Sequence, residues 1–182
     1  MAIQTGTKQA VGAVELLKQD HRKVKELFKE FEQAEESSTK GEIAEKAIKE
    51  LQVHSQVEEE IFYPEVRTAI ADPELMNEAK EEHHVVDLLI EEIQALSPDD
   101  EAFTAKFTVL AENVKHHIEE EENEMFPEAQ KARLDMQDLG QRMAERKQEL
   151  LGEITHGRNG RNGSKARRGN GNARRHSVRS KR

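Results

Sequence analysis

One pattern occurs twice in this chain and links two distant segments. A His is followed by a Glu four residues later and by a Pro ten residues later, first at His54, Glu58 and Pro64 and again at His117, Glu121 and Pro127. Residues four apart share a face of an α-helix, so each His–Glu pair directs an imidazole nitrogen and a carboxylate to one point. The pattern therefore predicts two copies of one helical unit.

A second pair of histidines extends the repeat upstream. His21 precedes His54 by 33 residues, and His83 precedes His117 by 34 residues. Four histidines and two carboxylates at matched spacing in two halves indicate a metal site built from a duplicated helical hairpin.

The apolar periodicity agrees with an all-α protein. Charged residues make up 36% of the chain and aromatic residues only 4%, a composition that favours helices. A first helix is expected over about residues 11–36. Three more are expected to start at Thr39 with Glu42 as a capping box, at Asp72-Pro73, and at the segment 97–100. The short connections between them predict an up-down-up-down four-helix bundle.

The chain divides into four parts by composition. Residues 1–10 are expected to form a flexible arm, 11–133 the bundle, 134–155 a C-terminal helix, and 156–182 a disordered tail rich in Arg, Gly and Asn. Pro64 and Pro127 lie late in their helices, where each is expected to kink or loosen the last turns.

Each predicted helix carries an ionisable residue on its apolar stripe. The stripe of the second helix includes His54, Glu58 and Ile61. On the third helix the stripe passes through His83 and leaves His84 on a polar face, and on the fourth it passes through His117 and leaves His116 outside. Burying carboxylates and imidazoles without compensation costs several kcal/mol per charged group. We therefore predict a central cation held by His21, His54, Glu58, His83, His117 and Glu121.

The ligand types restrict the metal. The chain has no Cys, and imidazole with carboxylate suits iron, manganese or zinc. Six protein ligands exceed the four of a structural zinc site, so two ions bridged by Glu58 and Glu121 are expected. The ligand types alone leave iron, manganese and zinc open.

These residues also carry a resemblance to a known family. The pairs Asp20-His21 and Glu82-His83, with the runs that end at Pro64 and Pro127, resemble the hemerythrin-like (HHE, cation-binding) family over about residues 11–133. The resemblance implies a four-helix bundle with a carboxylate-bridged di-iron centre, so that iron is favoured over zinc or manganese. It also implies a protein that binds or responds to O₂, peroxide or NO, or buffers iron, as in stress responses. It favours a binding protein, with peroxide decomposition as the enzymatic alternative.

One position departs from the oxygen-carrying members of that family. They have a further His one turn after the third-helix ligand, where this chain has Asp87. The resemblance is therefore closer to the open HHE branch than to reversible O₂ carriers. A ferritin-like di-iron bundle competes structurally, but the Glu-x-x-His spacing that it needs occurs only at Glu81 and His84, on a polar face. The remaining residues of the acidic runs 58–60 and 119–122 are interpreted as solvated or as steering cations inward.

The net charge of −9 combines two opposite parts. Residues 156–182 hold ten of the 28 Lys and Arg and no Asp or Glu, so the rest has 18 basic against 37 acidic residues and a net charge of −19. Residues 158–182 could bind nucleic acid non-specifically through phosphates, which gives an alternative function with the bundle as a sensing or structural unit. The tail could instead fold back on the acidic body.

The chain shows no sign of a membrane location. No apolar run approaches the roughly 18 residues of a spanning helix, and the first residues do not resemble a signal peptide. A cytoplasmic location is expected.

Overall fold

The computed structural model of the chain describes residues 11–162, and all regular structure within that range is helical. Four long helices form the bundle: α1 (Ala13–Gln33), α2 (Ser37–Val57), α4 (Pro73–Gln94) and α5 (Glu101–Glu120). The π-helical segments η1 (Glu58–Phe62) and η2 (Glu121–Met125) extend α2 and α5 and lead into α3 (Tyr63–Ala69) and α6 (Phe126–Lys131). Helix α7 (Met136–Asn162) follows.

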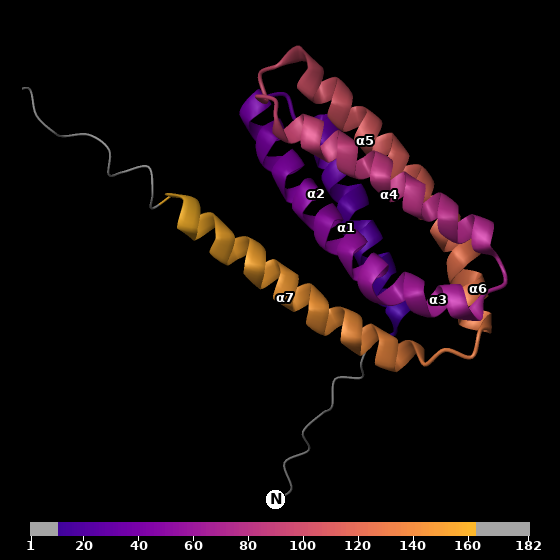
Figure 1. Cartoon of the computed structure of the whole chain (residues 1–182). Coiled ribbons are helices and arrows are strands. Elements are labelled where there is room, and N and C mark those ends of the chain that lie inside the picture. The colour runs from indigo at the N-terminus through magenta and orange to yellow at the C-terminus, as the bar shows by residue number, and fades with distance from the viewer. Residues whose placement is uncertain (1–10, 163–182) are drawn as a thin grey trace, which may run out of the picture.

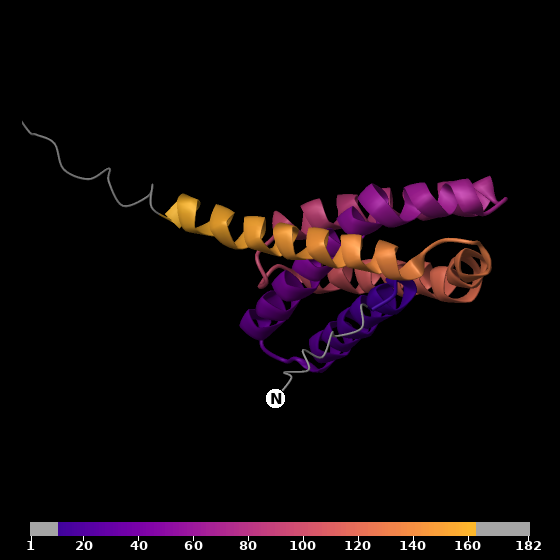
Figure 2. The ribbon, with the colours of Figure 1, turned by 90° about the horizontal axis from the view of Figure 1, so that it is seen from below.

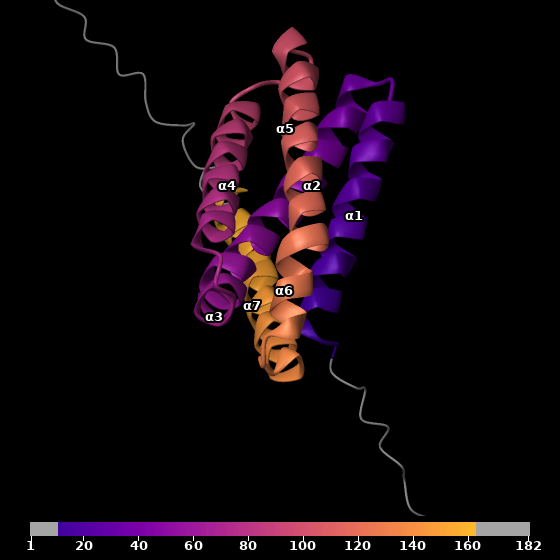
Figure 3. The same ribbon diagram turned by 90° about the vertical axis from the view of Figure 1, so that its right-hand side faces the viewer.

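The long helices pack as the predicted bundle. α1 packs against α2, α4 packs against α5, and α1 also contacts α5. The α1–α2 and α4–α5 connections lie at one end of the bundle, and α3 and α6 lie at the other end (Figure 3). The all-α, up-down-up-down architecture with a further C-terminal helix is confirmed (Figure 1).

The predicted helix starts are correct at one of three positions. Asp72 caps α4, because its side chain accepts hydrogen bonds from the backbone N–H groups of Glu74 and Leu75 at 3.1 Å each. The capping box at Thr39 is wrong: α2 begins at Ser37, and the bond from the Lys40 N–H to the Glu36 carbonyl already closes a turn there. A cap has to precede the first turn, and Thr39 lies inside it.

The start predicted for segment 97–100 is placed too early. Asp100, not Ser97, caps α5, and it accepts a hydrogen bond from the Ala102 N–H at 2.9 Å. The Asp100 N–H is itself bonded to the Ser97 carbonyl. Pro98 therefore belongs to a turn in front of the helix rather than to its first turn.

Each proline of the repeat follows a π-helical turn. The N–H of Tyr63 donates to the carbonyl of Glu58, and the N–H of Phe126 donates to the carbonyl of Glu121, five residues back in both cases. A π turn contains one more residue than an α turn. Phe62 is fully buried, and Ile61, which the sequence places on the apolar stripe, is partly buried and packs against the same cluster.

Helix α7 is longer than predicted. It continues to Asn162 instead of ending near Ile154, because an interior glycine such as Gly152 costs a helix only about 1 kcal/mol relative to alanine and need not end it. It runs along one side of the bundle and contacts α1, α2 and η1 (Figure 2). The predicted arm 1–10 and the tail residues 163–182 lie outside the described residues.

No helix within residues 11–162 is both long and apolar enough to cross a membrane.

Candidate metal centre

A layer of buried polar side chains divides the bundle core. One apolar cluster surrounds Phe28, Phe31 and Phe107 near the α1–α2 and α4–α5 connections. A second cluster surrounds Phe62 and Phe126 at the opposite end. Between them lie the six side chains that the sequence predicts as ligands, each at most 6% exposed: His21, His54, Glu58, His83, His117 and Glu121.

The six side chains form two groups that share Glu58. One group contains His21, His54, Glu58 and Glu121, and the other contains Glu58, His83 and His117; within each group the possible ligand atoms lie within 4.8 Å of one another. Glu58 Oε1 is 3.2 Å from His54 Nε2, and its Oε2 is 3.4 Å from His83 Nε2. One carboxylate thus has an oxygen on each side, which is the geometry of a bridging ligand.

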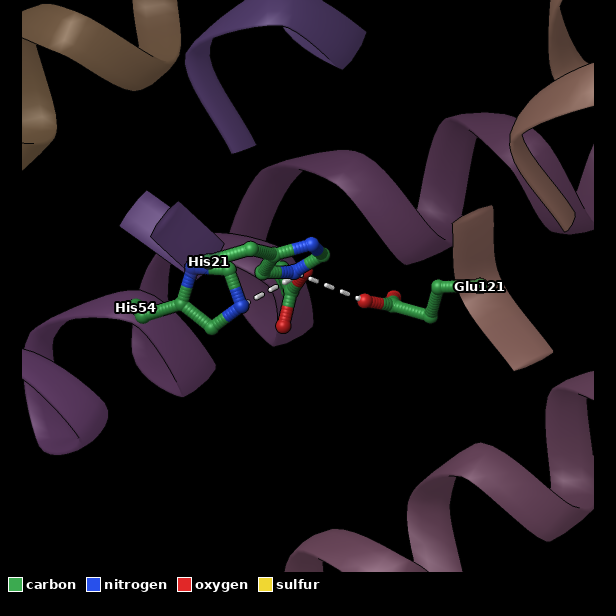
Figure 4. Close-up of side chains that lie close together, drawn as sticks. His21, His54 and Glu121 are labelled. Atoms are coloured by element: carbon green, nitrogen blue, oxygen red, sulfur yellow. Dashed lines mark ion pairs between the residues drawn. The ribbon is translucent and has the colours of Figure 1, made fainter. Parts of the chain in front are cut away.

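Glu121 occupies the equivalent position in the second half of the repeat. Its Oε2 lies 3.2 Å from His21 Nε2 and 3.6 Å from His117 Nε2. In Figure 4 the rings of His21 and His54 and the side chain of Glu121, from three different helical segments, converge on one volume. Both carboxylates of the repeat therefore join imidazoles from different helices.

The layer contains polar atoms that the protein itself does not satisfy. Within residues 11–162, the buried side-chain atoms without a hydrogen bond all belong to it: His21 Nε2, both ring nitrogens of His54, both oxygens of Glu58, and Glu121 Oε2. A buried polar atom left without a partner costs about 1–3 kcal/mol, and more if charged. Nitrogen and carboxylate donors directed at shared points match the ligand set of a metal cation.

The Nδ1 atom of each of the four buried histidines faces a carboxylate from another helical segment. The Nδ1 atoms lie 2.9 Å from Glu122 for His21, 3.0 Å from Glu59 for His83, 2.7 Å from Glu82 for His117, and 3.7 Å from Asp20 for His54. A carboxylate that accepts a hydrogen bond from Nδ1 orients the ring and leaves Nε2 free for a metal.

This arrangement corrects one interpretation made from the sequence. Glu59 and Glu122 do not merely decorate a solvated face, since each contacts a buried histidine from a different helix. The sequence contained a signal for these contacts. Glu58 and Glu121 are each followed directly by another Glu, and His21 and His83 are each preceded by an acidic residue. The sequence could not show which histidine each carboxylate reaches, because every such contact crosses between helices.

The carboxylates and imidazoles shift one another's pKa. Burial alone would raise the pKa of Glu58, but the His54 and His83 imidazoles hold it well below its usual range. Burial alone would lower the pKa of His54, yet Glu58 and Asp20 raise it to about 10. Against burial, Glu58 and Glu59 likewise raise the pKa of His83 to about 9. Protonated His54 and His83 imidazoles therefore supply the positive charge beside the Glu58 carboxylate.

The π turns bring one aromatic residue from each half to the centre. In an α-helix, residues five apart point in directions about 140° apart, whereas the i+5 hydrogen bond of a π turn places Tyr63 next to Glu58 along the axis. The Tyr63 hydroxyl donates to Glu121 Oε1 at 2.9 Å. Its counterpart Phe126 stacks on His21 with ring centroids 5.7 Å apart. The two halves of the site therefore differ, because only one has a hydroxyl donor.

A small cavity adjoins the imidazoles. It has a volume of about 20 Å³ and is lined by the four histidines, Asp20, Ser55 and the apolar side chains of Val24, Leu51, Val86, Val114 and Ile118. A single water molecule needs about 10–15 Å³ on this measure. The cavity therefore admits only a very small molecule beside the site.

The doubled histidines separate as the apolar stripes predict. His83 is 3% exposed and His84 is exposed; His117 is 5% exposed, while the side chain of His116 is 66% exposed and pairs with Glu120 on the surface. Glu81 is exposed as well, so the pair required for a ferritin-like site does not point into the bundle.

Comparison with known proteins places the bundle in a wider context. Residues 12–129 match the family model described as hemerythrin HHE cation binding domain. The fold is similar to the crystal structure of a hemerythrin HHE cation binding domain-containing protein from Mycobacterium kansasii, with a TM-score of 0.71 at 22% identity over 86% of this chain and 95% of that one. A protein of Nostoc sp. described as a DNA nickase is 31% identical over 123 residues, which is 68% of this chain and 35% of that protein. The chain thus spans about a third of the length of this curated relative.

Proposed function

Because this chain belongs to the hemerythrin HHE cation-binding domain family, whose members bind metal cations, we propose that it is a non-haem di-iron protein. The proposed role is to bind or respond to O₂, peroxide or NO, or to buffer iron. The observation that supports it best is the set of unsatisfied buried atoms on Glu58, Glu121, His21 and His54, which lie at the centre of the bundle without hydrogen bonds.

The ligand set supports two ions of iron rather than one structural zinc. Four imidazoles and two carboxylates provide more ligands than a four-coordinate zinc site uses. Glu58 belongs to both groups of ligand atoms, as a bridging residue must. Iron bound there would supply open coordination positions for a small ligand.

The surrounding residues support a small ligand rather than an organic substrate. The cavity beside the imidazoles holds about 20 Å³, with valine, leucine and isoleucine side chains on its far walls. These apolar walls offer no hydrogen bonds and leave no room for an organic substrate, while the Tyr63 hydroxyl donates its hydrogen bond to Glu121. A diatomic molecule or peroxide fits these dimensions. Binding is the favoured role, and peroxide decomposition is the enzymatic alternative; the expected cytoplasmic location stays a prediction.

Metal analysis of protein purified in air tests the proposal. We expect two iron ions per chain and an absorption band in the near ultraviolet that changes on addition of peroxide or NO. One tightly held zinc ion with no iron would contradict the di-iron proposal, since the carboxylates would then bridge nothing.

A second function concerns nucleic acid. Residues 163–182 contain eight Lys or Arg and no acidic residue, and the name of the Nostoc relative refers to DNA. Lys and Arg that neutralise phosphates release condensed counterions, so such binding is independent of sequence and weakens with salt. We propose that this segment binds duplex DNA and keeps the iron site near it.

Removal of residues 163–182 should abolish DNA binding without loss of iron, because no proposed ligand lies beyond Glu121. For the full-length chain, a plot of log affinity for DNA against log salt concentration should have a slope of about −4.5 if about five phosphates are contacted. A chain of full length with these Lys and Arg changed to Gln is the matched control and should also fail to bind. No shift of DNA by the full-length chain at low salt would favour a tail that pairs with the acidic body.

A further inference from the structure

Helix α7 lies outside the segment that matches the family, yet it reaches the metal centre. Lys147 of α7 forms an ion pair with Asp20 of α1. Both side chains are largely buried, at 16% and 11% exposure. Asp20 is also the carboxylate that faces the Nδ1 atom of His54. One aspartate therefore stands between a lysine from α7 and a proposed metal ligand.

The contact between His54 and its carboxylate differs from the three others. In those, Nδ1 lies 2.7–3.0 Å from a carboxylate oxygen. The distance from His54 Nδ1 to Asp20 Oδ2 is 3.7 Å, and this nitrogen has no hydrogen bond within residues 11–162. Among residues 11–162, the one Lys or Arg that pairs with Glu59, Glu82 or Glu122 is Lys25, which lies 3.5 Å from Glu122. Lys25 is 36% exposed and thus less buried than Lys147. Lys147 pairs with the Oδ1 atom of Asp20, and His54 Nδ1 faces the Oδ2 atom of the same carboxylate.

The position of Lys147 depends on how α7 packs. Leu139, Met143 and Leu150 of α7 are buried in the cluster at this end of the core. At Gly140 the helix approaches the segment before α1 so closely that a Cβ atom would lie 2.1 Å from the Val11 carbonyl oxygen. Only glycine allows this contact, which holds the buried face of α7 against the bundle and keeps Lys147 over Asp20.

We propose that Lys147 is a positioning residue: by holding Asp20 through Oδ1, it keeps Oδ2 too far from His54 Nδ1 for a hydrogen bond. The packing of α7 thereby weakens the binding of His54 to its metal. This inference rests on the proposed metal centre. While Lys147 holds Asp20, His54 lacks the hydrogen bond that orients the other three rings and makes them better donors. When α7 moves away or loses the lysine, Asp20 turns to His54 Nδ1 and the fourth ring becomes equivalent to the others. The helix that leads into the basic tail thereby adjusts one of the two metal positions.

The test measures transfer of iron(II) from anaerobic full-length protein to a chromogenic chelator. In Lys147→Met the slower phase of release should become about tenfold slower than in the unmodified chain, which is within the range of effects seen when carboxylates behind metal-bound histidines are altered. Lys147→Arg should restore the original rate. Arg142→Met is the matched control: Arg142 lies on the same helix and pairs with exposed Glu65, away from the site.

A double variant separates positioning from simple stability. In the Asp20→Asn background there is no carboxylate to compete for, so adding Lys147→Met should leave the release rate unchanged. If Lys147 only holds α7 in place, Lys147→Met should release iron faster than the unmodified chain, and this result would overturn the inference. Equal release rates for Lys147→Met and Arg142→Met would also overturn it. Absence of bound metal from the unmodified chain would instead refute the proposed function, and the inference with it.

Discussion

Replacement of His83 by Ala should remove at least one of the two proposed metal ions, whereas replacement of the adjacent His84 should leave the metal content unchanged. His83 is 3% exposed, and its Nε2 lies 3.4 Å from Glu58 and 3.1 Å from His117 Nε2. Its loss removes a ligand from the group that shares the Glu58 bridge. His84 is exposed on the other side of α4. Metal content measured after purification of both variants under the same conditions checks the prediction.

The second doubled pair gives an internal control on α5. His117→Ala should behave like His83→Ala, because His117 is 5% exposed and faces Glu121. His116→Ala should retain its metal, since it removes only a surface pair with Glu120. Loss of metal from His84→Ala and His116→Ala, with retention in the other two variants, would show that the buried histidines are not the ligands. Circular dichroism of each variant distinguishes loss of metal from loss of fold.

Removal of the metal should lower the melting temperature by roughly 8–16 °C. A ligand that binds only the folded state at about 1,000 times its Kd adds about 4 kcal/mol, and each 1 kcal/mol shifts the melting temperature of a protein of this size by roughly 2–4 °C. The physical reason is that Glu58 and Glu121 have buried oxygens without a hydrogen bond, which a bound cation would satisfy. Scanning calorimetry of the holo protein and of chelator-treated protein measures the difference.

The loss of stability should be local as well as global. Amide hydrogen exchange should increase most in η1 and η2, because the bridging carboxylates are the first residues of both π-helical segments. Glu58→Gln, which removes the charge of one bridge, should melt near the temperature of the metal-free protein with or without chelator. Equal melting temperatures for holo and metal-free protein would mean that the polar layer does not depend on a cation.

The periodicity of the sequence was sufficient for much of the architecture. The apolar stripes of α4 and α5 contain the residues that the structure buries, including His83 and His117. These assignments depend on the 3.6-residue period within one helix, which is a local property of the chain. The π turn of η1 was not predicted, because it changes the period and the sequence of η1 contains no local signal for it except the proline that follows.

The sequence by itself determined the helical bundle and the way in which two copies of one motif bring four histidines and two carboxylates to one level. Such features follow from side chains that share a helix face, so spacing alone reveals them. Only the tertiary structure decided which carboxylate contacts which histidine, that Tyr63 and Phe126 make the two halves unequal, and that Lys147 of α7 pairs with Asp20 beside His54. The physical reason is that these contacts cross between helices. Their geometry depends on how the helices pack, and no spacing along the chain encodes it.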